Sequence, residues 1–123
     1  MVKLVFCLRR LPSLSREEFQ RHWREQHAPL VRAAAAALRI TCYVQLHTLD
    51  TPLHASLRRA RGGPEEYDGV AELWFDSLED LAAAGSTPEG RDAGRRLFED
   101  ERRFIDLARS TVTLTTEHDV VPA

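Results

Sequence analysis

Two segments of the chain carry the side chains best suited to chemistry. His27 stands two residues before Pro29, and Tyr43, Gln45 and His47 alternate along a second segment. An imidazole titrates near neutral pH, so it can remove a proton from a substrate or return one. A phenol and a second imidazole can hold a substrate oxygen on which negative charge develops. These residue types predict acid–base chemistry on a small molecule, with His27 as the general acid/base and Tyr43 and His47 binding the oxygen.

The segment around His27 has the signals of an amphipathic helix. Ser15 followed by Glu18 three residues later forms a capping box, which sets the helix start. Pro29 lacks a backbone N–H, so the helix is expected to kink or restart there. Spacings of three and four residues turn one stripe toward the core. Its members are Phe19, Trp23, His27, Leu30 and Ala34. An ionisable ring is thus predicted on a buried helix face, beside an irregularity.

Two interpretations of each segment remain open. A single histidine on an apolar helix face is commonly a core residue whose ring nitrogens find partners among its neighbours. The coincidence of His27 with Pro29 favours a role in a site instead. The alternation of Tyr43, Gln45 and His47 on one strand face indicates either a pocket wall or an edge strand whose polar face meets water.

Side chains from other segments complete the predicted site. The candidate substrate-binding residues are Gln45, Glu72, Trp74, Phe19 and Trp23. Glu72 is the only charge in the strand-like segment 69–75, and it either orients a histidine or forms a salt bridge across a dimer. Apolar walls that would exclude water are formed by Phe6, Phe19, Trp23, Trp74, Phe98 and Phe104. His22 is expected at the surface.

Motifs for metals and cofactors are absent from the sequence. No two histidines are spaced four residues apart on one helix face with a carboxylate, and neither HExxH nor CxxC occurs. Neither GxGxxG nor GxxxxGK[ST] occurs, and there is no GxSxG nucleophile elbow. The sequence therefore predicts a site with no metal and no cofactor.

Length and charge limit the class of protein. The 123 residues suit a single domain, here residues 1–123. Seventeen basic and nineteen acidic residues leave a net charge of −2, which favours neither nucleic acid nor an anionic membrane as a partner. No segment is long and apolar enough to span a membrane, and the first residues are strand-like rather than a signal peptide. A cytoplasmic protein is expected.

The order of the predicted elements indicates a fold. Strands are expected at residues 2–8, 40–49, 69–75 and 110–117. Helices are expected at about residues 16–38, 78–84 and 88–108, the last with Glu101 among the residues of its apolar face. This β-α-β-β-α-β order predicts an α+β protein of the ferredoxin-like type, with helices on one face of a four-stranded antiparallel sheet.

Two further expectations follow from this arrangement. Residues 50–68 form a long connection, which is either a functional lid over a pocket or a solvated insertion without a role. The second face of the sheet is apolar, and one chain has nothing left to cover it. The sequence therefore predicts a homodimer whose sheets pack face to face.

Several segments together resemble the EthD-domain family. They are KLVF at residues 3–6, SREEF at 15–19 with Trp23, HAPLV at 27–31, YVQLH at 43–47 and DGVAELWF at 68–75. The resemblance implies a dimeric α+β barrel, with a pocket in each subunit between sheet and helices. Members and near relatives include cofactorless decarboxylases, dehydratases and cyclases of polyketide pathways, lactone isomerases, and proteins found with ether degradation.

Residues and resemblance together predict a small enzyme that needs no cofactor and transfers protons on an apolar substrate. The family implies an aromatic or polyketide-like compound and lyase, isomerase or cyclase chemistry. The competing class is a non-catalytic carrier or sensor that binds the same kind of ligand in the same pocket. Both classes need an apolar cavity with a few polar groups, so the sequence leaves both open.

Overall fold

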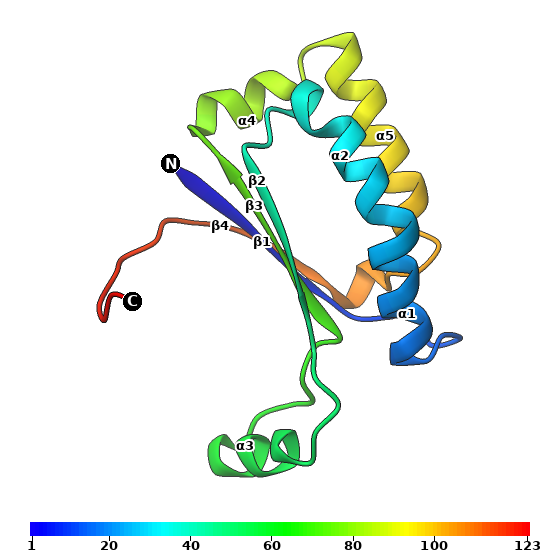
Figure 1. Ribbon diagram of the computed structural model, residues 1–123, viewed down its shortest axis with the longest axis vertical. Helices are drawn as coiled ribbons and strands as arrows, with labels where there is room; N and C mark the ends of the chain where they lie inside the picture. The colour runs from blue at the N-terminus through cyan, green and yellow to red at the C-terminus, as the bar shows by residue number, and fades with distance from the viewer.

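The computed structural model describes residues 1–123, and its four strands form one antiparallel sheet (Figure 1). The strands are β1 (Val2–Leu8), β2 (Cys42–His47), β3 (Gly69–Phe75) and β4 (Thr111–Thr115). They lie in the order β2-β3-β1-β4, with β2 and β4 at the edges. The predicted α+β class with a ferredoxin-like sheet is confirmed.

The main helices cover one face of this sheet (Figure 1). They are α1 (Arg16–His22), α2 (Ala28–Leu38), α4 (Leu78–Ala84) and α5 (Pro88–Glu101). Helices α2 and α5 pack side by side. A separate helix, α3 (Leu53–Arg61), buries no residue and lies beyond one end of the sheet. No helix is both long enough and apolar enough to cross a membrane.

The first helix begins and bends where the sequence indicates. The N–H of Glu18 donates to the Ser15 hydroxyl at 3.0 Å, and the N–H of Ser15 donates to the Glu18 carboxylate at 2.9 Å. Before Pro29 the chain forms a π-helical turn, Trp23–His27, in which the N–H of Ala28 bonds to the carbonyl of Trp23. Such turns occur frequently at functional sites. The irregularity expected beside Pro29 is therefore a widened turn that ends at His27.

The last helix is shorter than predicted. It ends at Glu101, because the backbone beyond it pairs with the chain after β1 instead of continuing the helix. The N–H of Leu11 donates to the carbonyl of Phe104 at 3.0 Å, and the N–H of Asp106 donates to the carbonyl of Arg9 at 2.8 Å. Phe104 is fully buried as a result. The apolar spacing past Glu101 thus marks a core-facing turn rather than more helix.

The core lies between the sheet and the helix layer. One cluster contains Leu8, Phe19, Trp23, Ala71, Phe104 and Ile105, and a second joins α2 to α5 through Val31, Ala34, Ala93 and Leu97. The Trp23 ring lies directly over Gly69, where an added Cβ would collide with it. This close approach fixes the ring between the helix and the strands that carry the candidate residues.

Candidate functional site

A cavity of about 200 Å³ lies between the sheet and the helices. Thirteen residues line it, eleven of them hydrophobic. They are Leu4, Phe6, Leu8, Trp23, His27, Val31, Tyr43, Ala71, Leu73, Leu97, Glu101, Ile105 and Val112. The cavity is apolar except for the imidazole of His27, the phenol of Tyr43 and the carboxyl of Glu101.

His27 is bound to a buried carboxylate. Its Nδ1 lies 2.8 Å from Oδ2 of Asp100, and the two residues are only 5% and 6% exposed. An ionised carboxylate only accepts hydrogen bonds, so Nδ1 carries the proton and donates a hydrogen bond to Asp100. Nε2 then keeps its lone pair, and it has no hydrogen-bond partner in the protein although His27 lines the cavity. Asp100 thus fixes the tautomer that leaves a basic nitrogen free.

Burial sets the charge of this imidazole. Burial, together with the neighbouring His22, lowers the pKa of His27 below 6.5 against the opposing effect of the Asp100 carboxylate. The ring is therefore neutral at pH 7, which is the form that can accept a proton. If it does so, the neighbouring carboxylate stabilises the imidazolium that forms.

Asp100 was not predicted as a site residue. It lies on the buried stripe of α5 with Gly90, Ala93 and Leu97, at spacings of three and four residues. A carboxylate on such a stripe requires a polar partner, and this signal was present in the sequence. His22 was expected at the surface, but it is half-buried because its ring packs 4.7 Å from that of Phe104 and its Nε2 bonds to Asp100 at 3.1 Å.

Glu101 brings a second titratable group to the cavity. Its side chain is half-buried, and no hydrogen-bond partner satisfies its carboxyl. Burial, with a further contribution from the neighbouring Asp100, raises the pKa of Glu101 from 4.5 to about 7. The cavity therefore holds a neutral base on one wall and a carboxyl that is partly protonated at neutral pH on another.

Tyr43 is held by two donors. Its hydroxyl oxygen accepts from Nε1 of Trp23 at 3.1 Å and from Nε2 of Gln45 at 3.0 Å. Burial raises its pKa above 10, so the phenol keeps its proton. No protein group accepts that proton. The O–H is thus available to donate to an oxygen of a bound molecule.

His47 lies one layer behind the cavity. Its Nε2 bonds to Oε1 of Gln45 at 2.8 Å, and its ring packs on Trp23 with centroids 4.5 Å apart. Because an amide oxygen only accepts, Nε2 carries the proton, and the buried Nδ1 has no partner. Burial, with a smaller effect of Arg24, lowers the pKa of His47, so the ring is neutral. It fixes the amide of Gln45, which in turn positions Tyr43.

The predicted polar row on β2 therefore forms one connected network. Gln45 links its members, since it bonds to Tyr43, to His47 and, at 3.0 Å, to the carbonyl of Trp23. β2 is an edge strand, but this face turns toward the helix layer and not toward water. Of the three, only Tyr43 lines the cavity.

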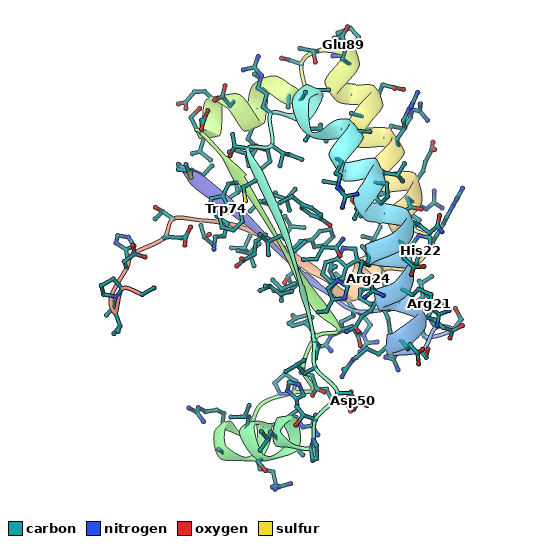
Figure 2. The ribbon with its side chains drawn as sticks, in the orientation of Figure 1. Arg21, His22, Arg24, Asp50, Trp74 and Glu89 are labelled. Atoms are coloured by element: carbon teal, nitrogen blue, oxygen red, sulfur yellow. The ribbon has the colours of Figure 1, made fainter.

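Two of the predicted substrate-binding residues lie on the face of the sheet opposite the cavity. Strand side chains alternate between faces, and Ala71 and Leu73 line the cavity, so Glu72 and Trp74 point to the opposite face. Glu72 accepts from Nζ of Lys3 at 3.2 Å and contacts no histidine. Figure 2 shows Trp74 across the sheet from His22. Glu72 and Trp74, which the sequence predicts as substrate-binding residues, therefore do not line this cavity.

The two aromatic residues of the helix differ in position. Trp23 lines the cavity, whereas Phe19 is completely buried in the core behind it. Their ring centroids lie 5.7 Å apart. Phe19 therefore supports the wall without forming it.

No group of three or more His, Cys, Asp or Glu residues is arranged to hold a metal ion, and His22, His27 and Asp100 are joined by hydrogen bonds instead.

Comparison with solved structures identifies chains of the same fold. An EthD family protein from Bacillus halodurans is 24% identical, with 96% of this chain and 99% of that chain covered and a TM-score of 0.63. A dimeric protein of unknown function and ferredoxin-like fold from Bacteroides fragilis is 14% identical, with 94% and 95% covered and a TM-score of 0.59. SnoaB, a cofactor-independent oxygenase from Streptomyces nogalater, is 16% identical, with 99% and 97% covered and a TM-score of 0.55.

At these sequence identities the similarity shows a common fold, and the chemistry of one protein does not carry over to another. The family model for the EthD domain matches residues 11–108 of this chain. That range contains every side chain of the network around His27, Asp100, Glu101 and Tyr43. The chain belongs to the EthD domain family.

Proposed function

We propose that this protein is a small enzyme that transfers protons on an apolar small molecule bound in the cavity, without a resident cofactor. The observation that carries the proposal is the state of His27. A neutral imidazole, oriented by a buried carboxylate at 2.8 Å, leaves a basic nitrogen without a partner in a residue that lines an apolar cavity. Most buried ring nitrogens that serve only the core are satisfied by hydrogen bonds, and the free Nε2 of His27 belongs to a residue that lines the cavity, unlike the unpartnered Nδ1 of His47.

The reaction begins with proton removal at a carbon next to a carbonyl. Nε2 of His27 accepts this proton, and Asp100 stabilises the imidazolium. The electron pair of the C–H bond moves toward the carbonyl oxygen, which becomes an enolate oxygen. The O–H of Tyr43 donates a hydrogen bond to that oxygen. A positioned general base of this kind is typically worth about 10²–10⁴-fold in rate.

Glu101 completes the proton balance. In its protonated form it can deliver a proton to a second carbon, or to a leaving oxygen, while His27 holds the first one. Isomerisation results in the first case and loss of water in the second. Afterwards His27 returns its proton and Glu101 regains one, so the protein ends in its starting state. The lowered pKa of His27 makes it a neutral base at pH 7, and the pKa of Glu101 near 7 keeps part of that carboxyl protonated, so one group can accept a proton while the other donates one.

The size and lining of the cavity indicate the substrate. A cavity of about 150 Å³ holds one benzene molecule, and this one measures about 200 Å³ with eleven hydrophobic lining residues. We therefore propose an aromatic substrate with one ring. The name of SnoaB, a cofactor-independent oxygenase, supports the idea that a chain of this fold can act on a small molecule without a cofactor.

We also propose that the protein is a homodimer. The sheet face opposite the helices includes Val5, Val44, Leu46 and Val70, and Leu46 is 46% exposed. Two such faces packed together would remove this apolar surface from water. The Bacteroides fragilis protein is described as dimeric, which supports the same assembly here.

Deuterium exchange of a simple aryl ketone tests the proposed function. In heavy water, the wild-type protein should accelerate exchange of the benzylic protons of 1-phenylpropan-2-one, with a rate that saturates as the ketone concentration rises. His27→Gln should keep the fold and lower exchange per folded molecule by about 10²-fold or more. Proton NMR gives the exchange rate, and thermal unfolding of the same preparation gives the stability.

Two results would oppose the proposal in different ways. Equal exchange by wild type and His27→Gln would remove His27 from the mechanism. Saturable binding of the ketone without exchange above the buffer rate would indicate a carrier. His54→Gln is the matched control, because His54 lies in α3, outside the cavity.

A further inference from the structure

A larger groove borders the cavity. It measures about 420 Å³ and lies between β2 and the helical segment 24–35. Its lining consists of Arg24, Ala28, Val31, Arg32, Ala35, Ile40, Thr41, Cys42, Tyr43 and Gln45. Val31 and Tyr43 line both the groove and the cavity, so the two spaces share a wall. Arg24, Arg32, Thr41 and Cys42 are exposed, so the groove faces solvent beside the cavity.

The charged side chains that line this groove are all positive. Arg24 and Arg32 are eight residues apart, about 12 Å along the helix, and they flank the same groove. No lining residue is acidic, and neither guanidinium forms an ion pair. By contrast, the arginines near the start of α1 are neutralised: Arg16, for example, bonds to Asp68 at 2.9 Å. Two unpaired cations over an apolar floor favour a ligand that is both anionic and apolar.

The geometry around the two arginines leaves room for such a ligand. Ala28 and Ala35 lie between and beyond them on the same helix face, and their side chains are the smallest that could stand there. Arg24 extends toward β2, where its charge contributes to the lowered pKa of His47 (Figure 2). A guanidinium pairs well with a carboxylate because its N–H groups match the two oxygens.

We propose that the groove binds the carboxylate of the molecule whose aromatic ring occupies the cavity. This inference rests on the proposed function and specifies its substrate class. That class is an aryl-substituted organic acid, with a short chain that runs past Val31 and Tyr43, the residues that line both spaces. The ring lies against the apolar wall, and the acid meets Arg24 or Arg32. The chain atoms between them then lie beside the hydroxyl of Tyr43, where the reacting carbonyl is required.

A pair of probes that differ only in charge tests this inference. 4-Phenylbutanoate and 4-phenylbutanamide have the same ring, chain and shape, and isothermal titration calorimetry on the full chain measures the affinity of each. A hydrogen bond to a charged group predicts that wild type binds the acid about tenfold more tightly than the amide. High ionic strength should weaken binding of the acid and leave binding of the amide unchanged.

Variants assign the preference to the groove. Arg24→Gln and Arg32→Gln together should remove the preference for the acid and keep the affinity for the amide. Arg91→Gln is the matched control, since Arg91 is an exposed helical arginine on α5 outside the groove. It should bind both probes as wild type does.

The possible outcomes separate this inference from the proposed function. Equal affinity of wild type for acid and amide overturns the carboxylate site and leaves the cavity as a ligand site intact. A preference that survives in the double variant also overturns it. No binding of either probe overturns the cavity as a binding site and this inference with it. A preference that disappears only in the groove variants supports the inference.

Discussion

Replacing Glu101 with glutamine tests whether the cavity keeps a carboxyl group protonated near neutral pH. Burial and the neighbouring Asp100 raise the pKa of Glu101 from 4.5 to about 7. Below pH 4.5 the group is protonated in both the folded and the unfolded chain, so it does not affect stability. Between pH 4.5 and about 7 the unfolded chain ionises first, and the folded state loses stability as the pH rises. Above that range the folded state contains an unpaired, half-buried carboxylate.

The size of this loss follows from the shift in pKa. One pKa unit corresponds to about 1.4 kcal/mol, so the rise from 4.5 to about 7 corresponds to about 3 kcal/mol. Because water still reaches the half-buried side chain, the expected loss is about 1–3 kcal/mol. Glutamine is neutral at every pH and has nearly the same shape. Glu101→Gln should therefore match wild type near pH 4 and exceed its stability by about 1–3 kcal/mol near pH 8.

Urea unfolding at a series of pH values measures this difference. Protein concentration is held constant, because a dimer gains stability with concentration. Subtracting wild type from the variant cancels the groups that titrate equally in both, including His27, whose lowered pKa destabilises the fold as the pH falls below 6.5.

Glu25→Gln is the control, because Glu25 is exposed and forms no ion pair; it should change stability by less than about 0.5 kcal/mol. A wild-type-to-variant difference that stays constant from about pH 4 to about pH 8 would refute the account of Glu101 as a buried acid.

Three further predictions concern the dyad, the helix start and the assembly. Asp100→Asn removes the charge that favours protonation of His27, so the acid limb of the pH profile of ketone exchange should move further below 6.5. The exchange rate should fall by about 10²-fold or more. An acid limb that does not move would contradict the role of Asp100. Ser15→Ala should lower the free energy of unfolding by about 1 kcal/mol and leave exchange per folded molecule unchanged, whereas lost exchange at full stability would assign Ser15 to the site. Light scattering at micromolar concentration should give a dimer for wild type and a monomer for Val44→Asp; a monomeric wild type would exclude the proposed assembly.

Some site residues could be predicted because their signals are local. Alternation along a strand puts Tyr43, Gln45 and His47 on one face, and the structure shows them joined through the amide of Gln45. Alternation along the strand of Glu72 does not by itself show whether Glu72 faces the cavity. Its strand reads as apolar on both faces, so the sequence does not reveal which face meets the helices. Only the packing of Ala71 and Leu73 against the cavity decides that Glu72 points away from it.

What the sequence determines by itself is the set of elements and several of their boundaries. A capping oxygen at Ser15 and a missing N–H at Pro29 act within a few residues of the chain, and each fixes the backbone wherever the helix docks. The tertiary structure alone decides the partner of His27. Asp100 is 73 residues away, and the two meet at 2.8 Å only because one helix end packs against another. Such packing depends on the fit of many side chains at once, and no local pattern contains it.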